Sequence, residues 1–196
     1  MLIKVLYSEQ LGIGYCIKDD SINTLIRRHC GLKIKGHYFL SLFEIYYLLN
    51  YKECMVCQYN EELKEQYDLE QYHWINDPVD FLNLFKPDVN RLCAYMHIRN
   101  MDHYLRLQLP TEQMKIINQQ VNNLPRKKMM EEDQQQNRNC EYLLYRVMSD
   151  YKNNVRGLKL SLALFQDGVD EEMLKSADVI GLMENGELKL IMLEDM

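Results

Sequence analysis

The amino-acid sequence predicts an α+β protein, with a small N-terminal α/β domain followed by a mixed β-sheet domain with flanking helices. Apolar residues recur at helical spacing over 41–49, behind a capping motif, and again over 89–96, behind Asp88. From Cys140 onward the apolar residues instead alternate along the chain, which is the period of strands. Helices and strands are therefore expected in both halves, with most of the sheet in the second.

The composition is that of a folded protein and excludes two classes. Of the 196 residues, 47% are hydrophobic and 27% are charged, which is ordinary for a globular chain. A net charge of −6 argues against a protein that coats nucleic acid by charge alone. No apolar run reaches the roughly 18–20 residues of a membrane span, so we expect no membrane partner.

The N-terminal 36 residues read as β structure and loop, and they contain the best local basic segment. Residues 22–30 fit either a short helix or an irregular loop. Positive charge gathers at Arg27 and Arg28 and again at Lys33 and Lys35. A solvated surface and a phosphate-contacting patch both fit this pattern.

The element that the sequence predicts most clearly is the helix that begins at Ser41. Ser41 and Glu44 form an S-x-x-E capping box, in which each side chain satisfies a backbone amide of the first turn. We expect Asn50 to take the left-handed conformation that ends the helix. Residues 54–59 then read as a short strand.

The six cysteines predict free thiols in a reducing compartment rather than a metal or redox site. They are scattered along the chain, and only Cys54-x-x-Cys57 has a ligand-like spacing. A structural zinc site needs a second such pair, and a strand places positions 54 and 57 on opposite faces. We therefore expect neither a metal nor a cofactor.

The middle of the chain divides the two domains. Residues 61–74 favour helix by propensity, and 76–87, bracketed by prolines, read as a linker between a domain at 1–75 and a domain at 88–196. A capped helix is expected over 88–100 and a strand over 103–109. The Gln/Asn-rich stretch at about 111–139 reads as a mobile, partly helical insertion.

The C-terminal region predicts strands over 141–148 and 158–164 and a hairpin over 178–193. Its turn is Asn185-Gly186, which suits a type I′ turn. Both faces of the last strand are largely apolar, so it lies between layers or meets a partner. One face carries Leu188, Leu190 and Met192. An acidic loop over 166–172 precedes the hairpin and carries Asp167, Asp170, Glu171 and Glu172.

The common catalytic motifs are absent from the sequence. It has no Walker motif, no H-E-x-x-H and no G-x-S-x-G. None of the five histidines lies beyond His103, so the C-terminal β region has no imidazole.

Two segments, in order, resemble the tRNA-intron endonuclease family. GHYFLSLFEIYYLLNYKECMV resembles the family's N-terminal domain, with its L-S-x-x-E-A-x-Y-L-L helix and following strand; Ile45 stands where Ala is common. FKPDVNRLCAYMHIRNMDHYLRL resembles the start of the family's nuclease-like domain, although Asp102-His103-Tyr104-Leu105 replaces the usual Gly-Tyr. The last strands resemble the end of that domain. The residues that match the first motif are Leu40, Ser41, Glu44, Tyr47, Leu48 and Leu49.

The resemblance implies a non-catalytic subunit. Active subunits of the family use a Tyr as base, a His as acid and a Lys that stabilises the transition state for attack by a 2′-hydroxyl. This chain has no histidine in the C-terminal strands where the family's acid lies. Loss of one acid–base group costs roughly 10²–10⁴-fold in rate. The larger structural subunit of the eukaryotic enzyme, with an insertion in its second domain, is the member that the chain resembles.

The resemblance also implies partners and a location. They are the catalytic subunits of the splicing endonuclease in a hetero-oligomer, precursor tRNA, and the nucleus. The acidic loop and the last strand would bind the partner subunit, and the basic segment over 27–35 would contact the RNA. Two alternatives stay open: an active subunit with Tyr104 or Tyr145 as base and His103 as acid, or an unrelated α/β interaction module.

Overall fold

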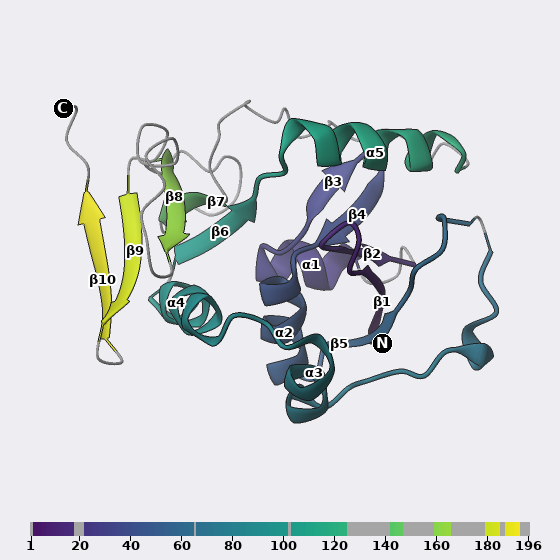
Figure 1. Cartoon of the computed structure of the whole chain (residues 1–196), viewed down its shortest axis with the longest axis horizontal. Coiled ribbons are helices and arrows are strands. Elements are labelled where there is room, and N and C mark those ends of the chain that lie inside the picture. The colour runs from purple at the N-terminus through teal and green to yellow at the C-terminus, as the bar shows by residue number, and fades with distance from the viewer. Residues whose placement is uncertain are drawn as a thin grey trace. The chain divides into compact units, whose positions relative to one another are not determined.

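The computed structural model describes residues 2–17, 22–64, 66–101, 103–124, 142–146, 159–165, 179–184 and 187–192 (Figure 1). The chain is an α+β protein, as predicted. It divides into two units, unit 1 with Met1–Pro87 and Leu109–Gln135 and unit 2 with Asp88–Gln108 and Gln136–Met196.

Unit 1 is built on a five-stranded mixed sheet. Its order is β3-β4-β2-β1-β5, in which only the β1–β5 pair is parallel. The strands are β1 (Ile3–Ser8), β2 (Ile13–Cys16), β3 (Leu32–Ile34), β4 (His37–Leu40) and β5 (Cys54–Gln58). The helix α1 (Ile22–Arg28) joins β2 to β3, and α2 (Leu42–Asn50) joins β4 to β5.

The helix α2 lies against one face of this sheet, at a point where only glycine fits. A methyl group at Gly14 would lie 2.5 Å from Val5 Cγ1 and 2.8 Å from Ile45 Cδ1. Ile45 and Leu48 are fully buried, so the helix contributes the centre of the unit 1 core. The helix over 42–50 and the strand after it follow in the order that the sequence predicted, whereas the strand β4 before the helix was not predicted.

The capping box of α2 is present, and its glutamate also bonds to the backbone of a second segment. The Glu44 amide donates to Ser41 Oγ at 3.2 Å, and the Ser41 amide donates to Glu44 Oε2 at 2.8 Å. The other carboxylate oxygen, Oε1, accepts from the Gly31 amide at 2.8 Å, where Gly31 has a φ of 92°. One buried carboxylate thus fixes both the start of α2 and the entry to β3.

The predicted end of α2 is wrong by two residues. Asn50 remains helical and donates from its side chain to the Tyr46 carbonyl at 2.9 Å. The left-handed residue is Lys52, with a φ of 55°. The Glu53 amide then returns to the Leu48 carbonyl at 3.0 Å, which closes the helix.

Residues 61–74 do not form the helix that their composition favours. Among the described residues of this stretch the only helical element is a 3₁₀ turn, Leu69–Gln71 (labelled η2). Its aromatic side chains pack on one another and on the sheet instead, with the Tyr67 ring 6.3 Å from Tyr15 and 5.7 Å from Tyr59. Tyr15 follows Gly14 along β2, so these rings lie on the face opposite α2.

A helix occupies the stretch expected as a linker. The helix α3 (Pro78–Phe85) begins at Asp77, whose Oδ1 accepts the Val79 amide at 2.7 Å. It packs beside α2, and its fully buried Phe81 has a ring centroid 5.7 Å from that of Tyr46 (Figure 1). The stretch is therefore part of the unit 1 fold, and the division falls between Pro87 and Asp88.

The first part of the expected insertion is an ordered helix of unit 1. The helix α5 (Thr111–Asn122) donates from the Gln113 side chain to the Leu11 carbonyl, in the β1–β2 turn. At its other end Asn122 Oδ1 accepts from Lys35 Nζ at 2.6 Å, in the β3–β4 turn. Residues 125–139, the rest of the predicted insertion, lie outside the described residues.

Unit 2 is a second five-stranded mixed sheet with one described helix against it. Its order is β10-β9-β8-β7-β6, and only the β8–β9 pair is parallel. The helix α4 (Val89–Asn100) contacts β6, β8 and β9. The strands are β6 (His103–Leu107), β7 (Tyr142–Arg146), β8 (Lys159–Phe165), β9 (Val179–Glu184) and β10 (Glu187–Met192).

The helix α4 begins where predicted but buries a different face. Asp88 Oδ1 accepts the Arg91 amide at 3.1 Å and caps the helix. The predicted apolar positions include Val89 and Cys93, and both are exposed. The buried residues are Leu92, Ala94, Tyr95, Ile98 and Arg99.

We predict that Glu44→Gln destabilises the protein by about 3 kcal/mol in urea denaturation. The substitution replaces one acceptor oxygen by a donor amide and leaves the Gly31 or Ser41 N–H buried without its partner. Glu62→Gln, which changes an exposed carboxylate, is the control and is expected to shift stability by about 0.5 kcal/mol or less. Equal effects of the two substitutions would contradict the role given to Glu44.

Candidate RNA-contact and partner-binding surfaces

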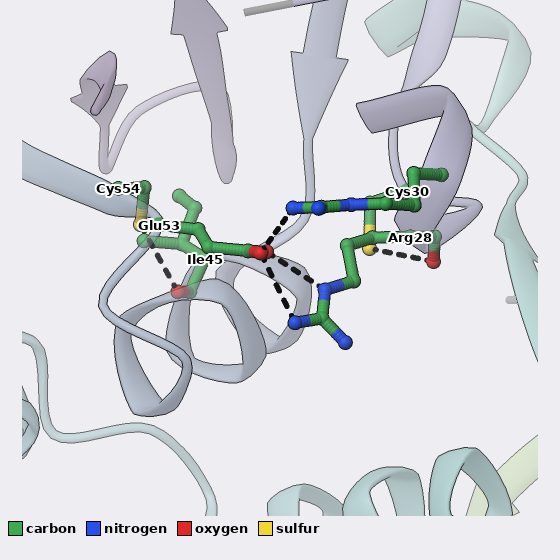
Figure 2. Close-up of polar contacts among 6 residues, drawn as sticks. Arg28, Cys30, Ile45, Glu53 and Cys54 are labelled. Carbon is green, nitrogen blue, oxygen red and sulfur yellow. Dashed lines mark hydrogen bonds and ion pairs between the residues drawn. The ribbon is translucent and has the colours of Figure 1, made fainter. Parts of the chain in front are cut away.

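The two predicted basic residues of α1 converge on a single carboxylate. Arg27 Nη2 donates to Glu53 Oε1 at 2.5 Å, while Arg28 donates from Nε to Oε2 at 2.8 Å and from Nη2 to Oε1 at 3.0 Å (Figure 2). Both arginines lie in the last turn of α1, where a positive charge is favoured by the helix dipole. Glu53 follows α2, so the cluster ties the two helices together.

Glu53 is held in place by its own backbone. Its carbonyl accepts the Ile3 amide at 2.9 Å, and its amide closes the end of α2. Arg28 is in turn packed on an aromatic ring, with its guanidinium carbon 3.9 Å from the Tyr51 centroid. The hydrogen bond to Glu53 raises the pKa of Arg28 above its ordinary value. This geometry makes Arg28 a structural clamp.

Arg27 is the more available of the two for a phosphate. Its side chain is 65% exposed, against 27% for Arg28. It shares the Glu53 carboxylate, so two guanidinium groups face one negative charge and the cluster keeps a net positive charge. An exposed guanidinium with surplus charge is suited to a phosphodiester contact.

The four predicted basic residues do not form one patch. Lys33 lies on β3, and Lys35 lies in the following turn with its Nζ bonded to Asn122. Strands β3 and β5 are the two edges of the unit 1 sheet, roughly 19 Å apart across four strand spacings. Glu53 immediately precedes β5, so the arginine cluster and the two lysines belong to opposite edges.

The predicted partner-binding strand is an edge strand of the unit 2 sheet. The strand β10 pairs with β9 from Glu187 opposite Glu184 to Met192 opposite Val179, and it ends the strand order. Leu190 is 38% exposed and Ile191 is 43% exposed, while Leu188 is half-buried. Because consecutive residues face opposite sides, apolar surface is exposed on both faces of this strand.

Part of the predicted partner-binding set lies outside the described residues. This applies to the whole acidic loop over 166–172, with Asp167, Asp170, Glu171 and Glu172, and to the Asn185-Gly186 turn. The backbone of Met192 is placed in β10. The described part of the predicted surface is therefore β10 itself.

The residues of the catalytic alternative lie on neighbouring strands. Tyr104 is paired in register with Tyr145, and His103 with Arg146. Consecutive positions of a strand belong to opposite faces, so His103 does not share a face position with either tyrosine. His103 Nδ1 lies 2.7 Å from the Met101 carbonyl, which requires that nitrogen to donate. In this register, His103 occupies a position on the opposite face of the sheet from the positions of the two tyrosines.

The Cys54-x-x-Cys57 pair is buried in the core of unit 1. Cys54 Sγ donates to the Ile45 carbonyl at 3.5 Å, and burial raises its pKa well above the ordinary value. Burial also raises the pKa of the Cys57 thiol to about 11. Thiols with raised pKa values are poor nucleophiles and poor metal ligands.

Comparison with known proteins does not assign a family to this chain. No protein-family model matches it, and no curated protein matches it. Within the described ranges, no group of three His, Cys, Asp or Glu residues is arranged to hold a metal ion. No helix in the described part of the chain has the length and apolar character needed to cross a membrane.

Sequence reasoning missed Glu53, the residue that organises the arginine cluster. It is separated from Arg28 by 25 positions, and no local pattern pairs the two. The available signal was indirect: an acidic residue immediately before a predicted buried strand, in the same region as a basic helix end. The segments come together in the fold, where β1 pairs with both β2, which precedes α1, and β5, which follows Glu53.

Alanine substitutions at Arg27 and Arg28 are expected to lower the free energy of unfolding by different amounts. We predict that Arg28→Ala costs about 1–2 kcal/mol, since it removes a two-point bond to a mostly buried carboxylate and an aromatic contact. Arg27→Ala removes an exposed contact and is expected to cost about 0.5 kcal/mol or less. Urea denaturation followed by Trp74 fluorescence measures both, and a larger loss for Arg27→Ala would refute the clamp.

Alkaline pH is predicted to weaken the fold through Cys57. The folded state holds this proton up to about pH 11, against an ordinary pKa of 9.0, so its stabilising contribution is complete below pH 9. That contribution, about 2–3 kcal/mol, is lost as pH rises from 9 to 11. Cys57→Ala should flatten the decline in unfolding free energy over this window, whereas Cys93→Ala, which removes an exposed thiol, should not.

Proposed function

We propose that this chain is a non-catalytic structural subunit of a tRNA-splicing endonuclease, which assembles and positions catalytic subunits on precursor tRNA in the nucleus. The proposal rests on the resemblance of residues 36–56 to the family's N-terminal domain. The helix α2, with its S-x-x-E cap, and the strand β5 that follows have the order that the resemblance requires. The start of unit 2, α4 followed by β6, has the order of the family's second domain.

The non-catalytic role is supported by the distribution of histidines. The family's general acid is a histidine within the C-terminal strands, and this chain has none beyond His103. His103 is the first residue of β6 and is bonded to the Met101 carbonyl. Without an acid to protonate the leaving oxygen, strand scission in this subunit is slow.

The edge strand β10 is suited to assembly. An edge strand offers unpaired backbone donors and acceptors to a partner strand, and β10 also exposes Leu190 and Ile191. Proteins that act alone usually protect such an edge with charge, and here Lys189 is the one basic residue between Leu188 and Met192. The proposed occupant is the equivalent strand of a catalytic subunit.

The proposed RNA contact is carried mainly by Arg27. Its exposure and the surplus positive charge of the Glu53 cluster favour a phosphate contact, which fixes position without reading sequence. Lys33 and Lys35, at the other edge of the sheet, would form a separate contact. Arg28 would support Arg27 through Glu53.

The proposed function is tested by asking whether endonuclease activity co-purifies with the chain. The tagged full-length protein is purified from its source cells, and the eluate is assayed for cleavage of a precursor tRNA. We predict that the wild-type eluate cleaves, that the recombinant chain alone does not, and that Leu190→Asp lowers the recovered activity by about tenfold or more.

A matched substitution separates loss of the interface from a general effect of charge. Leu84→Asp places the same charge at an apolar residue of similar exposure, 43% against 38%, on α3. It is expected to leave the recovered activity unchanged. Cleavage by the recombinant chain alone, or an eluate without endonuclease activity, would overturn the proposal.

A further inference from the structure

The connection between β6 and β7 is far longer than a hairpin requires. The two strands pair in register from His103 opposite Arg146 to Leu107 opposite Tyr142, so they form a hairpin within unit 2. Such a pair closes with two to five residues. Here residues 108–141 intervene, and the first part of them is the helix α5.

The helix α5 belongs to unit 1, although both strands that flank it belong to unit 2. Only three residues separate the end of β6 at Leu107 from the start of α5 at Thr111. One of them is Pro110, which begins the helix, and its carbonyl accepts the Met114 amide at 2.9 Å. The chain therefore passes directly from a strand of one unit into a helix of the other.

Specific contacts join α5 to unit 1 at both ends. Gln113 donates to the Leu11 carbonyl in the β1–β2 turn, and Asn122 accepts from Lys35 in the β3–β4 turn. The strand register places these two turns at opposite ends of the sheet, because Gly14 is paired with Leu40 and Ile34 with His37. The helix thus spans the length of the central strands.

One side of α5 is buried between these contacts. Ile117 and Val121, four positions apart, are buried, as is Leu124 just after the helix, whereas the neighbouring Ile116 is 45% exposed. A helix with this pattern is held by its apolar face and does not stand alone in water. Release of α5 would therefore expose apolar surface on the helix and on unit 1.

We propose that residues 108–124 are a docking arm: a segment inserted in a hairpin of unit 2 that completes the fold of unit 1. The arm makes the stability of the unit 1 sheet depend on a segment delivered by β6. When the arm is released, the β1–β2 and β3–β4 turns lose their contacts with α5 and β1–β4 open, while the β8–β10 part of unit 2 keeps its pairing. This inference does not depend on the proposed function.

A pair of adjacent isoleucines tests the arm in the full-length chain. Ile117→Ala shortens a fully buried side chain of α5, and Ile116→Ala makes the same change at an exposed position of the same helix. Amide hydrogen exchange with mass spectrometry then compares peptides from β1–β4 with peptides from β9–β10. Ile117→Ala is expected to speed exchange in β1–β4 by about tenfold or more, and Ile116→Ala by about twofold or less.

Trp74 gives a second readout, because it is the only tryptophan and lies in unit 1. Its indole donates to the Leu69 carbonyl at 2.9 Å, and Lys4 Nζ lies 5.4 Å from its ring. Ile117→Ala is expected to lower the urea midpoint of Trp74 fluorescence, and Ile116→Ala to leave it in place. Gln113→Ala, which removes the contact with the Leu11 carbonyl, should act in the same direction as Ile117→Ala.

Two patterns of hydrogen exchange would contradict the proposal that α5 is a docking arm of unit 1. If Ile117→Ala speeds exchange only in β9–β10, α5 supports unit 2 rather than unit 1. If Ile116→Ala and Ile117→Ala act equally on β1–β4, the apolar face of α5 does not hold the arm. Either result refutes the proposal, whatever the outcome of the cleavage assays.

Discussion

The buried carboxylate of Glu44 is the interaction on which unit 1 depends. It accepts hydrogen bonds from the Ser41 and Gly31 amides, so it sets the first turn of α2 and the chain entering β3 at the same time. Burying a carboxylate is costly unless its oxygens are satisfied, and here both oxygens are bonded to backbone amides. The position of α2 over Gly14, and hence of the whole sheet face, follows from this anchoring.

The arginine cluster depends on the same helix. The end of α2 places Glu53 beside β1 and β5, and Glu53 then orders Arg28 and, through a shared oxygen, Arg27. The basic segment of the sequence is therefore divided in the fold. Arg28 is held by Glu53, Arg27 is exposed, and Lys33 and Lys35 lie on and just after the edge strand β3. Whether basic residues that are close in the sequence form one binding surface depends on the strand order of the sheet.

Elements fixed by local hydrogen bonds could be predicted from the sequence, whereas elements that depend on tertiary contacts could not. The caps at Ser41 and Asp88 were found because each bonds within its own first turn. The stretch over 61–74 was predicted as helix from propensity alone, whereas in the fold its Tyr67 packs against Tyr15 of β2. The antiparallel pairing of β9 with β10 was predicted from a local hairpin signal. The pairing of Arg28 with Glu53 and the place of α5 in unit 1 depend on distant segments and left no local pattern.

We propose that this chain supplies no catalytic group, and a substitution at His103 is the sharpest test of that proposal. It is the last histidine in the chain and the acid of the catalytic alternative. The measurement is the single-turnover rate of precursor tRNA cleavage by the assembled complex carrying His103→Ala. We expect a rate within about twofold of wild type; a fall of roughly 10²–10⁴-fold with assembly intact would show that His103 acts in catalysis.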